Sequence, residues 1–225
     1  MAVRVDAFWL GRTRFQPCWE TQLALHSKIA GSNSPPALLL TEHEPVITLG
    51  RRADESNLYV SEDKLARLGI DLFHIERGGD VTYHGPGQLV GYPLLNLREL
   101  TLTVIDYVRT LEESLIALLG GLDIPCERTA GMTGVWHRGA KIAAIGIAVR
   151  GGVSYHGFAL NVSTDLSYFD LINPCGLSRP VTSIERVKGS APPLDVLART
   201  YAETFAETFG VRVAMKNAQG RIGNL

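Results

Sequence analysis

Apolar and polar residues follow two different periods along the chain. Short apolar runs and alternating stretches predict β-strands, and apolar positions three and four residues apart predict amphipathic helices. The expected strands cover residues 3–10, 37–41, 46–49, 71–76, 134–137, 141–149, 153–160 and 211–215. The expected helices cover residues 17–30, 61–68, 104–119 and 194–209. This interleaving predicts an α+β fold, in which helices pack on a mixed or largely antiparallel sheet.

The predicted helices carry residue types that favour helix ends. Ser61 and Thr103 are suitable N-caps, and Asp106, three residues after Thr103, completes a possible capping box. Gly210 is a suitable stop for the last helix. Because no repeat or long linker interrupts the pattern, we predict a single domain over residues 1–215 and a flexible tail over residues 216–225.

Composition and charge narrow the class of protein. The chain has 225 residues, 45% of them hydrophobic, which is enough for a sizeable core and excludes global disorder. Its formal net charge of -1 gives no overall attraction to nucleic acid or to an anionic membrane. No apolar run approaches the roughly 18 residues of a membrane helix, and the first residues lack a targeting pattern. We therefore expect a cytoplasmic protein that binds neither nucleic acid nor membranes.

A glycine-rich segment, residues 77–88, follows one of the predicted strands and reads as one long turn. It holds four glycines and a proline, with Arg77, Thr82, His84 and Gln88 interleaved among them. Glycines let the backbone approach a ligand closely, and interleaved polar side chains favour a site over a plain turn. The spacing of the glycines fits neither a phosphate-binding P-loop nor a dinucleotide-binding turn. We predict a binding site for something other than a nucleotide.

The three cysteines are far apart and form no C-x-x-C pair, so neither a zinc site nor any other metal or cofactor is predicted. Cys18 lies in an expected helix and Cys126 lies beside an expected strand, so both are interpreted as packing residues. Cys175 lies in the turn-forming sequence Asn-Pro-Cys-Gly, which favours an accessible sulfur. Cys175 is therefore the candidate nucleophile.

A nucleophilic thiol needs a neighbour that favours the thiolate, and the candidates are His84, His156 and Lys141. Lys141 begins a strand whose other residues are almost all apolar. Against an apolar surface, desolvation would lower the pKa of its amine and let it act as a general base. A lysine at the start of a strand often extends into water instead, so the residues alone leave this choice open.

Several ordered blocks resemble the octanoyltransferases of lipoic acid assembly. Residues 77–92 match the pattern R-G-G-x-x-T-x-H-x-P-G-Q-x-x-x-Y at every fixed position. Residues 43–51 resemble the stretch H-x-P-V-x-T-x-G-R, and residues 141–146, 156–162 and 173–176 resemble later blocks in order and spacing. Ordered blocks are more specific than any single motif. The resemblance implies the catalytic-domain fold of biotin/lipoyl protein ligases.

The resemblance also implies roles for individual residues. Cys175 would carry the acyl group as a thioester, and Lys141 would be its general base and acid. The implied acyl-binding positions fall on three segments, where small and apolar residues suit an alkyl chain. They are Arg77, Gly78, Gly79, Asp80, Val81, Thr82, Tyr83, His84, Ala144, Ile145, Gly146, Gly157, Phe158 and Ala159.

The activity implied is that of an acyltransferase. It would move an octanoyl group from octanoyl-acyl carrier protein to one lysine of a lipoyl domain, without ATP. This would be the first step of protein lipoylation from endogenous fatty acid synthesis. The implied acceptors are the lipoyl domains of 2-oxoacid dehydrogenase complexes and the glycine cleavage H protein.

Two alternatives stay open. An ATP-dependent lipoate or biotin ligase of the same fold activates its acid as an adenylate and needs no cysteine, so Cys175 argues against it. A cysteine hydrolase would pair Cys175 with His84 or His156, and an acyl-binding module would carry out no chemistry. The sequence does not show whether water reaches an acyl-enzyme, which is the difference between hydrolase and transferase.

Overall fold

A computed structural model of the chain describes residues 2–173 and 179–217. Eight of the strands form one mixed sheet in the order β11-β1-β2-β6-β10-β9-β8-β7. β1 is parallel to β2 and β11, and the other neighbours are antiparallel. The predicted α+β class and mixed sheet are thereby confirmed. These strands are β1 (Arg4–Thr13), β2 (Ala37–His43), β6 (Gln88–Leu94), β7 (Glu127–Thr129), β8 (Met132–His137), β9 (Ala140–Arg150), β10 (Val153–Asn161) and β11 (Arg212–Asn217).

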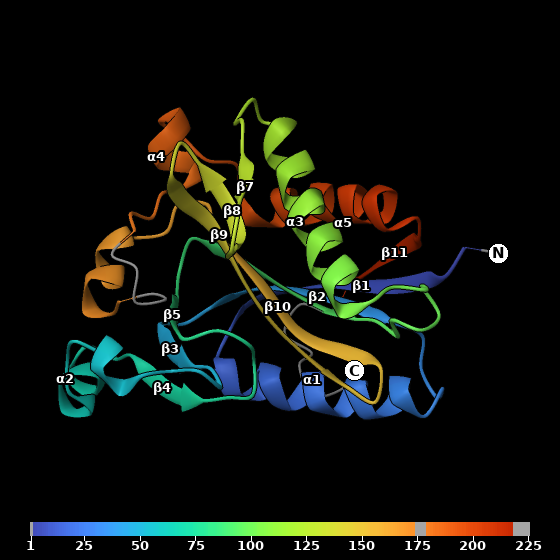
Figure 1. Cartoon of the computed structure of the whole chain (residues 1–225), viewed down its shortest axis with the longest axis horizontal. Helices are drawn as coiled ribbons and strands as arrows, with labels where there is room; N and C mark the ends of the chain where they lie inside the picture. The colour runs from blue at the N-terminus through green and yellow to red at the C-terminus, as the bar shows by residue number, and fades with distance from the viewer. Residues whose placement is uncertain (1, 174–178, 218–225) are drawn as a thin grey trace.

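Helices cover both faces of this sheet (Figure 1). α3 (Val104–Gly120) and α5 (Leu194–Phe209) pack on one face, over the largest hydrophobic core, and α1 (Phe15–Ala30) packs on the other face against β6 and β10. The capping box predicted at Thr103 is present: its hydroxyl accepts from the backbone N–H of Asp106, whose carboxylate accepts from the N–H of Thr103. The short α4 (Ile184–Lys188) precedes α5.

A second, smaller sheet lies at one end of the large sheet (Figure 1). It consists of β4 (Asp71–His74), β3 (Val46–Leu49) and β5 (Val81–His84), with β3 in the middle. Around it lie α2 (Glu62–Arg67) and two 3₁₀ turns, η1 (Glu55–Asn57) and η2 (Leu166–Leu171). Ser61 caps α2, as predicted, by accepting from the backbone N–H of Lys64. The small sheet has a hydrophobic core of its own.

The expectation of one long turn over residues 77–88 is wrong. Val81–His84 form β5, and Gln88 begins β6, a fully buried strand of the large sheet. β6 was not predicted from the sequence because Gly91 and Pro93 interrupt its apolar run, and glycine and proline both disfavour strands. Gly91 is required nonetheless, because a Cβ there would collide with the ring of Phe158 on the neighbouring strand.

At the C-terminal end, β11 continues to Asn217, two residues past the predicted end of the strand. Residues 218–225, the rest of the predicted tail, lie outside the described part of the chain. Among the described residues, no helix is long and apolar enough to cross a membrane.

Candidate active site

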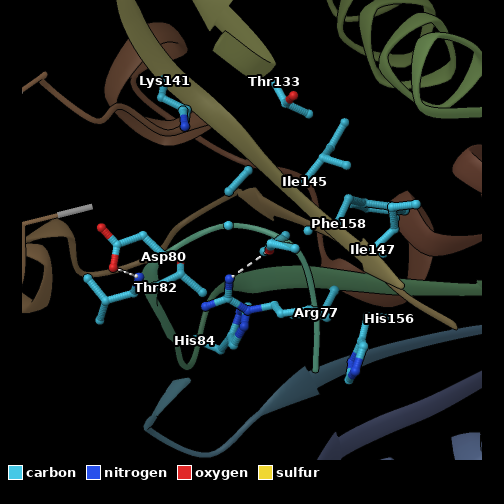
Figure 2. A pocket seen from close by; sticks show the side chains of 18 of the residues that line it. Arg77, Asp80, Thr82, His84, Thr133, Lys141, Ile145, Ile147, His156 and Phe158 are labelled. Carbon is cyan, nitrogen blue, oxygen red and sulfur yellow. Dashed lines mark hydrogen bonds between the residues drawn. The ribbon is translucent and has the colours of Figure 1, made fainter. Parts of the chain in front are cut away.

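A cavity of about 330 Å³ lies where the small sheet meets β6, β9 and β10. Its volume is in the range typical of small-molecule sites. Apart from Tyr83, every residue predicted to bind the acyl group lines this cavity, and so does Lys141. Figure 2 shows the segment with Arg77 and Asp80 on one side and β9, with Lys141 and Ile145, on the other. The fold therefore brings together segments that lie far apart in the sequence.

The loop before β5 is fixed by the side chain of Arg77. Its Nη2 donates to the carbonyl of Thr48 at 2.6 Å, its Nε donates to the hydroxyl of the same residue, and its Nη1 donates to the carbonyl of Gly78. The backbone N–H of Gly78 in turn donates to the carbonyl of Ile147 on β9 at 2.8 Å. Arg77 is thus a buried anchor of the loop as well as part of the cavity wall.

Asp80 ties the same loop to the η1 turn. One carboxylate oxygen accepts from the backbone N–H groups of Val81 and Asp54, and the other accepts from Asn57 Nδ2 at 2.6 Å. The carbonyl of Asn57 accepts from the backbone N–H of Asn173 at 2.7 Å. The chain that leads to residue 174 is therefore attached to the wall of the cavity through Asn57 and Asp80.

Tyr83 departs from the prediction. Residues of a strand alternate between its two faces, and on β5 the side chain of Tyr83 points away from the cavity lined by Thr82 and His84. Its ring stacks on that of Tyr168, with centroids 4.8 Å apart, in the core of the small sheet. Tyr83 is a packing residue in this structure.

Lys141 lies near the start of β9 and at the edge of the cavity. Its Nζ lies 4.8 Å from the centre of the Trp136 ring, and Figure 2 shows the amine directed toward the side of the cavity with Asp80 and Thr82. Its backbone N–H donates to the carbonyl of Pro180, and its carbonyl accepts from the N–H of Thr182, both at 2.9 Å. The chain that follows the undescribed residues 174–178 therefore runs alongside Lys141.

The histidines around the cavity are kept neutral by burial. Burial lowers the pKa of His84 to about 3 and that of His43 to about 4, and it lowers the pKa of His156 as well. His84 Nδ1 lies 2.8 Å from Gln88 Oε1, and Gln88 Nε2 donates to Asn161 Oδ1. An imidazole with a lowered pKa is a weaker base toward a thiol, so His84 and His156 are weaker partners for a nucleophile than the sequence alone suggested.

His156 has an unusual backbone conformation, with φ at +56° in the middle of β10. Its backbone N–H donates to Gln22 Oε1 of α1, and its Nε2 lies 3.8 Å from Glu76 Oε2, beyond hydrogen-bond distance. Such strain in a buried residue is found most often at functional sites. His156 also lines the cavity.

Two of the cysteines are packed as predicted. Cys18 is buried in the core under α1, and Cys126 packs against the main core, and neither lines the cavity. Burial raises the pKa of Cys18 to about 12 and that of Cys126 to about 11, so neither supplies a thiolate at neutral pH. Cys175 lies outside the described residues.

Some residues next to Lys141 were not predicted. Trp136 and the segment from Pro180 to Thr182 border Lys141, although no sequence pattern connects them with residue 141. Asn161 also lines the cavity without having been predicted, and its place in a block that carries the resemblance was the one signal for it. Its partner Gln88 was among the polar residues that favoured a site in the glycine-rich segment. No group of three or more His, Cys, Asp or Glu side chains suited to a metal ion occurs among residues 2–173 and 179–217.

Comparison with known proteins identifies the family. The lipoyl protein ligase A/B catalytic domain matches residues 15–206. An octanoyltransferase of Alkaliphilus metalliredigens is 50% identical over 182 residues, which are 80% of this chain and 84% of the relative. An octanoyltransferase of Koribacter versatilis is 54% identical over 164 residues, which are 70% of this chain and 65% of that relative.

Solved structures share the fold at low sequence identity. The crystal structure of lipoate-protein ligase A bound with ATP has a TM-score of 0.77 and 18% identity, covering 100% of this chain and 92% of that one. Biotin protein ligase from Aquifex aeolicus in complex with biotin and ATP has a TM-score of 0.56 and 14% identity, covering 91% and 70%. The predicted biotin/lipoyl ligase fold is confirmed. The chain belongs to the lipoyl protein ligase A/B catalytic domain family, and within it to the octanoyltransferases, which are acyltransferases.

Proposed function

We propose that this protein transfers an octanoyl group from octanoyl-acyl carrier protein to a lysine of a lipoyl domain, through a thioester on Cys175 and without ATP. The observation that carries the proposal is the position of Lys141. Its side chain lines the cavity, and its backbone is hydrogen-bonded to Pro180 and Thr182, on the chain that continues from Cys175. Cys175 and Pro180 are five residues apart.

The segment upstream supports the same arrangement. Asn173, two residues before Cys175, is held to Asn57, which is held to Asp80 in the cavity wall. Both ends of the short stretch that contains Cys175 are therefore attached to the cavity that Lys141 lines. A thiol within reach of this amine would have the base that a cysteine nucleophile needs.

The walls of the cavity suit an alkyl chain. Ala144, Ile145, Phe158 and Ala159 contribute apolar surface from two adjacent strands. Burying a methylene group stabilises a complex by about 0.8 kcal/mol, so the six methylenes of an octanoyl chain would contribute about 5 kcal/mol. This burial would help to bind the octanoyl chain of the donor, and would keep the chain in the cavity once the acyl group is attached to Cys175.

In the proposed mechanism, Lys141 takes the proton of Cys175, and the thiolate attacks the thioester carbonyl of the donor. The tetrahedral intermediate collapses and expels the carrier thiolate, which receives a proton from Lys141. The neutral amine of the acceptor lysine then attacks the acyl-enzyme and passes a proton to Lys141. The C–S bond breaks, the amide forms, and Lys141 returns the proton to the Cys175 thiolate. Conversion of a thioester to an amide is favourable, so no ATP is needed. The acceptors would be lipoyl domains of 2-oxoacid dehydrogenase complexes and the glycine cleavage H protein.

Intact-mass analysis tests the proposal. Incubation with octanoyl-acyl carrier protein alone should add one octanoyl group to the protein, and peptide mapping should find it on Cys175. Cys175→Ala should abolish the adduct, whereas Cys126→Ala, a matched change at a half-buried cysteine, should retain it. Addition of an unmodified lipoyl domain should discharge the adduct into one lysine amide in the absence of ATP.

Other outcomes would favour the alternatives. Rapid release of free octanoate without an acceptor would indicate a hydrolase, because water must then reach the acyl-enzyme. An absolute requirement for ATP, with no adduct on the protein, would indicate a ligase that forms an acyl adenylate. Stable non-covalent binding of octanoate without transfer would indicate an acyl-binding module.

A further inference from the structure

We infer that Glu112, on α3 and outside the cavity, is a positioning residue for Lys141; its catalytic consequence rests on the proposed role of Lys141 as general base. The inference begins with an unusual feature of α3. Glu112 is a carboxylate with 0% of its side chain exposed. Burying a charge costs free energy unless the charge is paired and hydrogen-bonded. The groups that contact Glu112 are therefore the ones whose positions its carboxylate stabilises.

The two carboxylate oxygens of Glu112 have different partners. Oε2 accepts from Arg109 Nη1 at 2.8 Å and from Arg128 Nε at 3.2 Å. Oε1 accepts from the backbone N–H of Gly134 on β8 at 3.0 Å. The two arginines thus compensate the buried charge, while the remaining oxygen fixes a backbone position in the sheet.

The stem of Lys141 lies beside Gly134, on the side where a side chain at position 134 would project. A Cβ on Gly134 would lie 3.5 Å from Lys141 Cε and 3.7 Å from its Cδ, and 2.7 Å from the carbonyl oxygen of Ala143. Gly134 also has φ at +128°, a conformation that side chains rarely adopt. Because the Lys141 side chain lies next to the position that a Cβ of Gly134 would take, a displacement of Gly134 changes the space available to that side chain.

The pairing of β8 with β9 is irregular next to Lys141. Val135 pairs with Ala143 but Trp136 pairs with Lys141, so Ile142 is an extra residue on β9, a β-bulge beside Lys141. Bulges turn the side chains next to them and weaken the local ladder of hydrogen bonds. The hydrogen bond from Gly134 to Glu112 supplies a fixed point at this weak position, and it joins β8 to the rigid helix α3.

The same geometry sets the position of the amine over an aromatic ring. Lys141 Nζ lies 4.8 Å from the centre of the Trp136 ring, and Trp136 is two residues after Gly134 on β8. Fixing Gly134 therefore fixes both the ring and the backbone that border the Lys141 side chain. The ring also gives a measurable signature, because protons above an aromatic ring are shifted upfield in NMR spectra.

The test follows the Lys141 ε-methylene resonance in protein labelled with ¹³C-lysine. The chain has only five lysines, and Lys141→Arg assigns the resonance. Glu112→Gln keeps the size of the side chain but replaces one carboxylate oxygen with an NH₂ donor. That donor must face either the N–H of Gly134 or the arginines, which are donors themselves, so one of the two contacts is lost and the buried side chain is displaced. We expect the Lys141 resonance to move toward the positions of the other lysines. We also expect kcat for octanoyl transfer to fall at least tenfold, with KM for the donor changed less than twofold.

Glu113→Gln is the matched control. Glu113 pairs with the same Arg128, at 2.6 Å, but its side chain is 52% exposed and makes no contact with Gly134. This variant should leave the Lys141 resonance and kcat unchanged. Glu112→Asp is a second variant that keeps the buried charge but is one carbon–carbon bond shorter, so the acceptor for Gly134 is lost. It should move the resonance in the same direction, and it provides the test if Glu112→Gln does not fold.

The inference would be overturned if the Lys141 resonance did not move in Glu112→Gln or, should that variant not fold, in Glu112→Asp. It would also be overturned if Glu113→Gln moved the resonance equally. The resonance separates this result from a failure of the proposed function. If Lys141→Ala retained full transfer activity, Lys141 would not be the base, yet the resonance would still show whether Glu112 positions it.

Discussion

Replacing Gly146 with alanine should detach the glycine-rich loop from β9. A Cβ at position 146 would lie 2.8 Å from the carbonyl oxygen of Gly78 and 3.1 Å from Arg77 Cδ. Both distances are shorter than ordinary van der Waals contact, and the closer one involves backbone. The loop cannot simply move aside, because the N–H of Gly78 is bonded to the carbonyl of Ile147 at 2.8 Å and Arg77 is anchored on Thr48.

The size of the effect follows from these contacts. Overpacking of a tight interior position costs about 1–3 kcal/mol, and weakening the bond between Gly78 and Ile147 adds about 1 kcal/mol. We expect the free energy of unfolding to fall by about 2–4 kcal/mol. Since the displaced loop is also a cavity wall, the yield of octanoyl adduct per minute should fall even at temperatures where the variant is fully folded.

Urea unfolding followed by tryptophan fluorescence measures the first quantity, and intact mass measures the second. Gly120→Ala is the control, because a Cβ at the end of α3 meets no atom within 4 Å. In a helix this change should be neutral or stabilise the protein by up to about 1 kcal/mol. A Gly146→Ala protein whose unfolding free energy lies within about 0.5 kcal/mol of the wild type would refute the argument.

Three further predictions concern the nucleophile, the base and the buried histidines. Blocking Cys175 with iodoacetamide should abolish octanoyl transfer, whereas the raised pKa of the Cys126 thiol should keep that residue unmodified at neutral pH; peptide mapping identifies the site. Lys141→Ala and Lys141→Arg should both lose transfer, because alanine has no base and a guanidinium does not release its proton; near-normal transfer by either variant would disprove the role. His43 and His84 have folded-state pKa values of about 4 and about 3, below the unfolded value of about 6.5, so the unfolded state binds more protons as the pH falls. The stability that the two histidines contribute should therefore be fully present above about pH 6.5. Below that pH the free energy of unfolding should fall by up to about 1.4 kcal/mol per pH unit for each histidine. Urea unfolding at pH 7 and pH 5.5 should measure this loss, and the loss should be smaller in His84→Asn.

Local patterns predicted the fold where one period dominates. The helix α3 could be read from its apolar spacing and the Thr103 cap, and β10 from its apolar residues. β6 could not be read, because the fit of Gly91 against Phe158 and the placement of Pro93 depend on strands far away in the sequence. The local penalties of glycine and proline are outweighed there by burial between two neighbours.

The residues of the candidate site were likewise predicted only in part. The resemblance identified residues that the fold brings together around one cavity. It assigned the whole segment 77–84 to the binding site, however, without separating side chains that face the cavity from those that do not. Tyr83 was included because it lies between Thr82 and His84, although a strand turns alternate side chains to opposite faces. The role of Glu112 could not be predicted from the sequence, where it is one polar position on a long helix. The packing of α3 against β8 brings it to the backbone N–H of Gly134.

The ladder between β1 and β11 has a consequence for how the protein folds. It pairs Arg4 with Arg212 and Trp9 with Asn217, so its contacts join residues about 200 positions apart. Contacts of such long sequence separation form slowly, because the intervening chain must first be ordered. During synthesis from the N-terminal end, β1 and β2 emerge early, while the strand that covers the outer edge of β1 emerges last. Throughout that interval the edge of β1 offers unpaired backbone groups to any other extended chain, which makes the nascent protein most prone to aggregation before residue 212 has left the ribosome.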